Sequence, residues 1–399
     1  MPKLLQITDK PEQGGGIRRA VDQQRRMLEA LSWRVDLLRL VPNGPSRTLA
    51  DKAAESGRGA VSVRLRGGPS QAASSVAALR RAAQGADVIQ LHLGFATLVP
   101  ELAAAAAETA PLVTVLHDVS PFEALGPSRG VLGAGRSRLP LREGIGRLRH
   151  RPMRRALWHL LCERSRLFIA PSAYLARCAV AAGLDEAKLR VIPHAVEAEV
   201  PAAPPPSRQA PVVLYAGLIS EDKGACLLVE AFARLRVPGA RLVLLGDGPA
   251  LPALRRRAAR LGLARQVTFH GRVAGEEVRR AMARARCLAH PSLVPEGFGL
   301  VGMEAMQLGR PVVGFGLGGT ESWLVDGESG LVAAPTDAAA LAEAIDRVLR
   351  DDALADRLGA AARCRVERDF LEPRVAAALA RALTAAMAGP AARLSEGVA

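Results

Sequence analysis

The chain has 399 residues, which is enough for two or three domains of ordinary size. Hydrophobic residues make up 49% of it and charged residues 23%, a balance that excludes a globally disordered chain. No apolar run reaches the ~18 residues of a membrane-spanning helix. The apolar run near the start of the chain, Leu4–Ile7, is too short for the core of a signal peptide. The five cysteines are widely spaced, without a Cys-x-x-Cys pair. We therefore expect a cytoplasmic protein without a structural metal.

The net charge is +15, and much of it is concentrated in one stretch. Eleven arginines but only two glutamates lie in residues 124–166. Such a patch favours an anionic partner, such as the inner face of the cytoplasmic membrane. However, only five of the 54 basic residues are lysines, so a general bias toward arginine explains the stretch equally well. Aromatic residues make up only 3% of the chain, too few to offer the stacking platforms of a nucleic-acid-binding protein.

Short apolar runs alternate with amphipathic, helix-length segments through the first half of the chain. The runs that predict strands are 4–8, 35–41, 61–65, 88–93, 112–117, 167–170 and 190–193. The segments that predict helices are 17–31, 71–83, 154–163 and 172–182. Continuous apolar strands separated by helices are typical of a parallel sheet built from βαβ units.

A proline-rich segment, residues 201–211, interrupts this alternation with five prolines in eleven residues and predicts an interdomain linker. The alternation then restarts. The predicted strands are 212–216, 242–245, 267–269, 287–289, 311–315 and 331–333. The predicted helices are 224–235, 251–261, 276–285 and 300–308, followed by a helical, alanine-rich region over 338–387. We therefore expect an α/β protein with two doubly wound, Rossmann-like domains, 1–200 and 212–370, and a ligand cleft between them.

The most informative stretch runs from His290 to Val313 and contains two glutamates eight residues apart, Glu296 and Glu304. Between them, Gly297, Phe298, Gly299 and Leu300 lead from a strand into the start of a helix. The N–H groups at such a helix start bind anions, and carboxylates accept hydrogen bonds from sugar hydroxyls. This set of groups fits a sugar, a diphosphate and a ribose. The plainer alternative is a glycine turn flanked by solvated charges.

This string resembles the signature of the retaining GT-B glycosyltransferases of family 4, Glu-x7-Glu with Gly-Phe-Gly after the first glutamate. Further segments resemble the same family. They are Leu214–Gly224, Leu244–Pro249 and Val267–Gly271 in the second half and, more weakly, Gly14–Gly16, Thr114–Asp118, Ala170–Ser172 and Val191–His194 in the first. The resemblance implies a GT-B fold in which residues 371–399 form a C-terminal helix that returns to the N-terminal domain, and a tail. It also implies a nucleotide diphosphate sugar as substrate and no cofactor or metal.

The resemblance assigns roles to particular residues. It implies that Glu296, His117 and Lys223 are catalytic. It also implies donor binding by Gly16, Gly217, Lys223, Gly248, Glu296, Gly297, Phe298, Gly299, Leu300 and Glu304. Lys223 is the last lysine of the chain and precedes a glycine at a helix start, where an ammonium can meet a phosphate. His117, like His92, ends an apolar strand, where α/β active sites gather, although a lone histidine is more often structural.

The chain departs from the family pattern at several positions. Leu218 follows Gly217 where the family commonly has an arginine that contacts the diphosphate. His194 stands where the family usually has asparagine after the proline. The segment around Glu321 lacks the usual Pro-Glu, so we carry no role onto that residue.

We therefore expect a hexosyltransferase that uses a glycan or lipid-linked acceptor in the synthesis of polysaccharide, glycolipid or lipopolysaccharide. An epimerase or phosphorylase of the same fold would keep the donor pocket and is the alternative among enzymes. A non-catalytic, arginine-rich protein that binds anionic surfaces is the alternative outside them.

Overall fold

The computed structural model describes residues 1–8, 15–42, 60–65, 69–92, 100–119, 151–201 and 203–389. By its internal contacts the chain forms two compact units. Of the described residues, those up to 119, those from 151 to 195 and those from 373 to 389 belong to unit 1, and those from 196 to 372 belong to unit 2. Residues 124–150, which are most of the arginine-rich stretch, lie outside the described residues. Within the described residues, no helix is long and apolar enough to cross a membrane.

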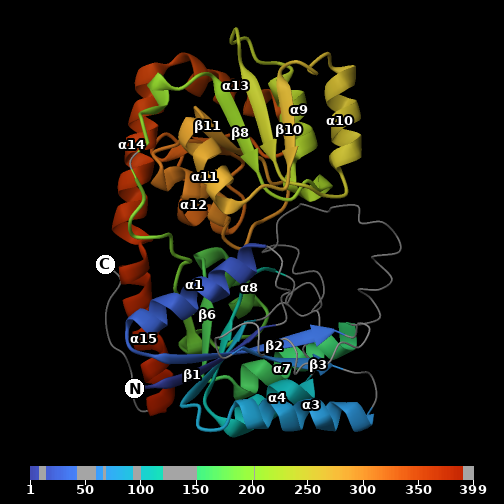
Figure 1. Cartoon of the computed structure of the whole chain (residues 1–399), viewed down its shortest axis with the longest axis vertical. Coiled ribbons are helices and arrows are strands. Elements are labelled where there is room, and N and C mark those ends of the chain that lie inside the picture. Colours follow the sequence, from blue (N-terminus) through green and yellow to red (C-terminus); the bar gives the residue numbers. More distant parts are fainter. Residues whose placement is uncertain are drawn as a thin grey trace. The chain divides into compact units, whose positions relative to one another are not determined.

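Unit 1 is built on a seven-stranded, fully parallel sheet (Figure 1) with the strand order β3-β2-β1-β4-β5-β6-β7. Its strands are β1 (Lys3–Thr8), β2 (Arg34–Pro42), β3 (Ala60–Leu65), β4 (Val88–His92), β5 (Leu112–Val115), β6 (Leu167–Ala170) and β7 (Leu189–Val191). Its helices are α1 (Gly16–Ala30), α3 (Pro69–Ala82), α4 (Pro100–Thr109), α7 (Arg151–Arg164), α8 (Ala173–Ala181), the 3-10 turn Glu186–Lys188 and α15 (Glu372–Ala388), which belongs to this unit from Pro373 onward.

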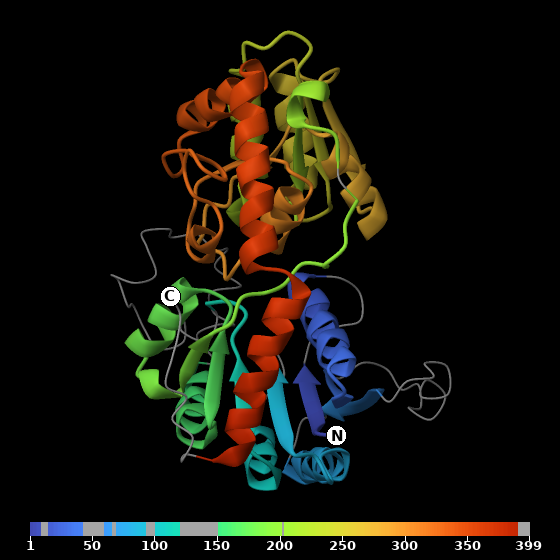
Figure 2. The same cartoon turned by 90° about the vertical axis from the view of Figure 1, so that its left-hand side faces the viewer.

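Helices cover both faces of this sheet because its strands are apolar on both sides. One core joins Leu5 and Ile7 of β1 to α3, α4, α7 and α8. The other core joins Leu4 to α1 and to α15. Figure 2 shows α15, in red, running along the strands of unit 1 with α1 beside it. The sequence patterns did not single out α4, whose run of alanines carries no polar periodicity.

Unit 2 has a six-stranded parallel sheet with the order β10-β9-β8-β11-β12-β13. Its strands are β8 (Val212–Ala216), β9 (Arg241–Leu245), β10 (Val267–Gly271), β11 (Cys287–His290), β12 (Val312–Gly314) and β13 (Gly330–Val332). Its α-helices are α9 (Ala225–Phe232), α10 (Leu251–Arg260), α11 (Gly275–Arg284), α12 (Leu300–Gln307), α13 (Ala338–Arg350) and α14 (Asp352–Asp369). Three 3-10 turns, Pro206–Arg208, Glu221–Lys223 and Gly319–Ser322, complete it. The two sheets flanked by helices confirm the predicted α/β fold with two Rossmann-like domains.

Alternate residues of β8 enter opposite cores of unit 2. Val213 and Tyr215 pack with α9, α10 and α13, whereas Leu214 and Ala216 pack with α11, α12 and α14. The alanine-rich region predicted to be helical consists of three helices, α13, α14 and α15. It is interrupted at Asp351, whose carboxylate caps α14 by accepting a hydrogen bond from the N–H of Leu354 (2.8 Å).

The proline-rich segment lies against unit 2. Pro206 is buried, and its carbonyl accepts a hydrogen bond from the buried Arg286 guanidinium (2.9 Å). Arg310, also buried, donates to the carbonyl of Pro204. Arginine side chains thus donate hydrogen bonds to the carbonyls of this segment. The segment cannot form a regular strand, because proline has no N–H to donate to a neighbouring strand.

Candidate functional site

In unit 2, the loops after β8 and β9 touch through their backbones. A Cβ atom on Gly248 would lie 2.3 Å from the carbonyl oxygen of Ile219, and one on Gly246 would lie 1.8 Å from that of Gly217. The N–H of Ile219 donates to the carbonyl of Asp247 (3.0 Å) across the same contact. A side chain at Gly246 or Gly248 would therefore push the two loops apart.

A second close approach places Lys223. Gly224 is the N-cap of α9 and has a left-handed backbone (φ 71°), and a Cβ atom there would lie 1.9 Å from the carbonyl oxygen of Pro291. The N–H of Leu293 donates to the carbonyl of Asp222 (2.8 Å) and holds the same two loops together. As a result, Lys223 Nζ lies 2.7 Å from Glu296 Oε1, although 73 residues separate them in the chain.

Glu296 lies among groups that favour its charged form. Burial by itself would raise its pKa, but Lys223 and His290 and the hydrogen bonds from Lys223 and Ser292 outweigh burial, so the pKa lies below its ordinary value. Burial lowers the pKa of His290. Burial, together with the charge of Glu296, raises the pKa of Tyr215, whose hydroxyl donates to the Leu218 carbonyl (2.6 Å). At neutral pH Glu296 is therefore a carboxylate, and the imidazole of His290 and the phenol of Tyr215 are neutral.

Trp323 fixes the glycine turn that begins α12. The indole Nε1 donates to the carbonyl of Phe298 (2.6 Å), and the ring is fully buried. Gly299 has φ 87°, and a Cβ atom there would lie 3.1 Å from the indole ring. Gly302, one turn later, lies even closer to it, since its Cβ would be 2.1 Å from Trp323. The indole thus requires small residues along this side of α12.

The predicted donor-binding residues of unit 2 lie along these loops. Gly217 and Gly248 lie on the loops after β8 and β9, and Lys223 and Glu296 form an ion pair. Gly297, Phe298, Gly299 and Leu300 form the start of α12, and Glu304 lies one turn inside it, half-buried. The arrangement places a cation and a carboxylate beside a helix amino end, which suits an anion joined to a hydroxyl-bearing group.

Leu218 lies on the same loop, and its side chain is 52% exposed. This is one of the positions at which the sequence departs from the family pattern. The apolar side chain brings no charge to the loop that holds Gly217 and Lys223.

Gly16 and His117 belong to unit 1. Gly16 begins α1 directly after Gly15, which has φ 102°. His117 lies two residues beyond β5 and is 6% exposed, with its Nε2 3.0 Å from Nδ1 of His92. The ring of His194 lies on another side of it, with centroids 5.6 Å apart and planes at 12°.

Sequence reasoning gave no role to His290 or Tyr215, which lie beside Glu296. Their position in the sequence offers a signal, because His290 ends β11 and Tyr215 lies near the end of β8. The carboxyl ends of parallel strands converge at one edge of a sheet, where ligand sites form.

Two family models match the chain. The model described as glycosyl transferases group 1 matches residues 197–365, and the model described as glycosyltransferase family 4 matches residues 14–200.

Curated relatives match a limited part of the chain. Glycogen synthase of Mycobacterium tuberculosis is 36% identical over 179 residues, which is 44% of this chain and 43% of that protein. Alpha-D-kanosaminyltransferase of Streptomyces kanamyceticus is 33% identical over 37% of this chain and 39% of its own length. The GDP-mannose-dependent alpha-(1-6)-phosphatidylinositol monomannoside mannosyltransferase of Mycolicibacterium smegmatis is 35% identical over 38% and 42%, respectively. The chain thus spans less than half the length of the curated relatives it matches.

Solved structures are similar over nearly the whole chain. HepE of Anabaena, in complex with UDP and glucose, has a TM-score of 0.74 at 21% identity and covers 96% of this chain and 100% of its own. Sucrose-phosphate synthase of Thermosynechococcus elongatus has a TM-score of 0.72 at 24% identity and covers 98% and 100%. This similarity shows the fold that the chain shares with them.

Proposed function

Because the chain belongs to the glycosyltransferases of group 1 and family 4, we propose that it moves a hexosyl unit from a nucleotide diphosphate sugar to an acceptor hydroxyl. The observation that carries this proposal is the Lys223–Glu296 ion pair, 2.7 Å long, beside the start of α12. A diphosphate bound at that helix start takes Lys223 as its counter-ion. Glu296 is then released to accept a hydrogen bond from the transferred sugar, while Glu304 accepts one from the ribose.

We propose further that transfer retains the configuration of the anomeric carbon. The bond between that carbon and the diphosphate oxygen breaks, and the acceptor oxygen forms its bond on the same face. The acceptor's proton passes to the departing diphosphate. Lys223 and the amino end of α12 stabilise the negative charge that develops on the leaving group. The relative HepE, whose structure contains UDP and glucose, supports a donor of this class.

Nucleotide release and the product decide between the candidate enzymes. We expect UDP, GDP, ADP or dTDP to raise the melting temperature of the full chain, and the matching nucleotide sugar to release nucleotide once a glycan or lipid-linked acceptor is added. Isomerised donor without transfer would indicate an epimerase, and release driven by phosphate a phosphorylase. Proton NMR of the glycosidic bond reports the anomeric configuration, and an inverted product would contradict retention.

An anionic membrane surface is a proposed partner of unit 1. Helix α7 exposes Met153 and Arg155 and buries Leu157 and Trp158 on its other side. Each basic group near an anionic surface contributes about 1 kcal/mol and is screened by salt. We expect sedimentation with phosphatidylglycerol vesicles at low salt and little with phosphatidylcholine, and weaker sedimentation after Arg154→Ala with Arg155→Ala. Equal binding to the two lipids would contradict the proposal.

A further inference from the structure

A buried chain of amide and imidazole side chains crosses unit 1 and ends at His117. Gln24 comes from α1, Gln6 from β1, and Gln90 and His92 from β4, where Gln6 and Gln90 are register partners on neighbouring strands. All five residues are at most 7% exposed, and both Gln6 and Gln90 are fully buried. Burying polar groups costs free energy unless they are hydrogen-bonded, so the contacts between them are informative.

These side chains contact one another in sequence. Gln90 Oε1 accepts a hydrogen bond from Gln6 Nε2 (2.9 Å), and Gln90 Nε2 donates to Gln24 Oε1 (3.0 Å). His92 Nε2 lies 3.2 Å from the same Gln90 Oε1, and His92 Nδ1 lies 3.0 Å from His117 Nε2. The imidazole centroids of His92 and His117 are 5.2 Å apart with planes at 23°.

The amide of Gln90 decides which atom donates and which accepts in each of these hydrogen bonds. Its Oε1 can only accept, so His92 Nε2 carries the hydrogen. A neutral His92 then has a lone pair on Nδ1, and His117 Nε2 must donate to it. In the opposite direction every amide would be reversed. Gln6 Oε1 has no hydrogen-bond partner in the described structure, and reversal would put a buried NH2 group there, which folded proteins tolerate less well than an unpaired carbonyl.

The environment keeps His92 neutral, as this direction requires. Burial, with a further contribution from His194, lowers the pKa of His92 to about 3. Burial also lowers the pKa of His194, whose ring lies parallel to that of His117, to about 4. A neutral imidazole on each side restricts how the His117 ring can turn.

We propose that Gln90 and His92 are positioning residues that hold His117 in the tautomer protonated at Nε2. Its Nδ1, which is buried in the structure, then accepts a hydrogen bond from a hydroxyl of the transferred sugar once the groups that cover this atom move aside. The sugar contact rests on the proposed function, whereas the tautomer does not. His117 then acts only as an acceptor and orients a hydroxyl whose hydrogen points at the ring. Without the contact between His92 Nδ1 and His117 Nε2, His117 can adopt either tautomer. The tautomer protonated at Nδ1 presents an N–H to the sugar hydroxyl and cannot accept its hydrogen bond.

Nitrogen NMR of the full chain with 15N-labelled histidine tests the tautomer directly, with His117→Gln used to assign the signals. We expect the wild-type protein to show His117 protonated at Nε2 and bare at Nδ1. His92→Asn places an amide oxygen near the former Nδ1 and should keep this tautomer. His92→Leu, and independently Gln90→Met, should give a mixture. A wild-type His117 protonated at Nδ1 would overturn the proposal that Gln90 and His92 position His117. So would an unchanged tautomer in both His92→Leu and Gln90→Met.

Thr114→Val is the matched control, because it removes another buried hydrogen bond of the same sheet, between Thr114 Oγ1 and Ser165 Oγ (2.9 Å). It should lower stability and leave the His117 tautomer unchanged. Turnover is measured with the nucleotide sugar whose nucleotide raises the melting temperature. We expect His92→Leu to lower kcat about tenfold and His92→Asn to keep most of the wild-type kcat. A mixture of tautomers with an unchanged kcat would overturn the hydrogen bond between His117 and the sugar. It would not overturn the positioning of His117 by Gln90 and His92.

Discussion

The Lys223–Glu296 contact is partly buried, with side-chain exposures of 30% and 16%, and an ion pair that stays open to solvent adds little stability. Its geometry, however, places an ammonium against Glu296, four residues before the start of α12. Leu218 adds no charge to this loop. Lys223 should therefore matter more for binding a diphosphate than for folding.

We predict that Lys223→Ala weakens binding of the bare nucleoside diphosphate and slows turnover by about 10- to 100-fold, the value of a hydrogen bond to a charged group. Lys223→Arg should restore only part of this loss, because a planar guanidinium does not replace a compact ammonium. Calorimetric titration and initial rates at fixed ionic strength measure both effects. Arg265→Ala, an exposed basic position of the same unit, is the control. Values within about twofold of wild type for Lys223→Ala would show that the phosphate lies elsewhere.

The buried histidines of unit 1 make its stability depend on pH. The pKa of His92 is lowered to about 3 and that of His194 to about 4, so the unfolded chain binds protons below pH ~6.5 that the folded chain does not. Stability should therefore fall as the pH drops from about 6.5 toward 4, by on the order of 5 kcal/mol for the two groups together.

Hydrogen exchange of the β4 and β5 amides at several pH values measures this loss. His92→Asn removes one titrating group, so the variant should lose less stability between pH 7 and pH 4 than the wild type loses. Equal losses in the two proteins would show that His92 does not titrate as the structure indicates.

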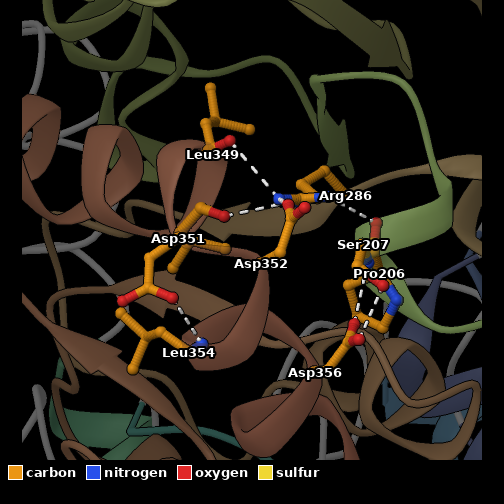
Figure 3. A network of polar contacts seen from close by, with 9 residues as sticks. Pro206, Ser207, Arg286, Leu349, Asp351, Asp352, Leu354 and Asp356 are labelled. Atoms are coloured by element: carbon orange, nitrogen blue, oxygen red, sulfur yellow. Dashed lines mark hydrogen bonds and ion pairs between the residues drawn. The ribbon is translucent and has the colours of Figure 1, made fainter.

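At the scale of elements, one buried arginine connects α13, α14 and the proline-rich segment of unit 2 (Figure 3). Arg286 is 3% exposed, pairs with Asp352, and donates to the carbonyls of Pro206 (2.9 Å) and Val348 (3.2 Å). Asp356 holds the same segment by accepting hydrogen bonds from the N–H (2.8 Å) and hydroxyl (2.6 Å) of Ser207. These polar contacts replace the ladder hydrogen bonds that prolines cannot make.

We predict that Arg286→Met destabilises unit 2 by about 2–5 kcal/mol, because it leaves the buried carbonyls of Pro206 and Val348 without a donor, at about 1–3 kcal/mol each. Chemical denaturation followed by circular dichroism measures the change. Arg284→Met, at an exposed position two residues earlier, should change stability by less than ~0.5 kcal/mol. Similar losses in the two variants would mean that the segment is held by other contacts.

At the scale of the whole molecule, the C-terminal helix completes the core of the N-terminal unit. Leu379 and Leu383 of α15 are buried with Leu4, Met27 and Leu28. Arg166 Nη1 donates to the carbonyl of Ala386 (3.0 Å) at the end of the helix. Unit 1 therefore cannot complete this core before α15 is made.

We predict that Leu383→Ala destabilises unit 1 by about 2–5 kcal/mol, the usual cost of a cavity in a packed core. Hydrogen exchange should quicken in β1, β5 and β6 and stay unchanged in β8 and β11. Thr384→Ala, on the exposed side of α15, should leave both units unaffected. Faster exchange in the unit 2 strands alone would contradict the assignment of α15 to unit 1.

Local patterns in the sequence were sufficient to locate many of the strands and helices. Apolar runs located β1, β8 and β9 to within a residue or two, because strands buried on both faces must be continuously apolar. The Glu-x7-Glu string likewise located the start of α12, since glycine punctuation before a helix is a local signal. Element ends were less accurate. The break at Asp351, for example, depends on a cap that an alanine-rich pattern does not reveal.

Only the tertiary structure decided which distant residues meet. Lys223 reaches Glu296 because the backbone of Gly224 touches that of Pro291, and no periodicity encodes such an approach. The same holds for His92, His117 and His194, which three separate strands or the loops after them bring together. The burial that keeps two of these histidines neutral depends on every helix packed around them. A sequence carries composition and spacing directly, whereas contacts between remote residues, and the pKa values that follow from them, arise only when sheets and helices pack.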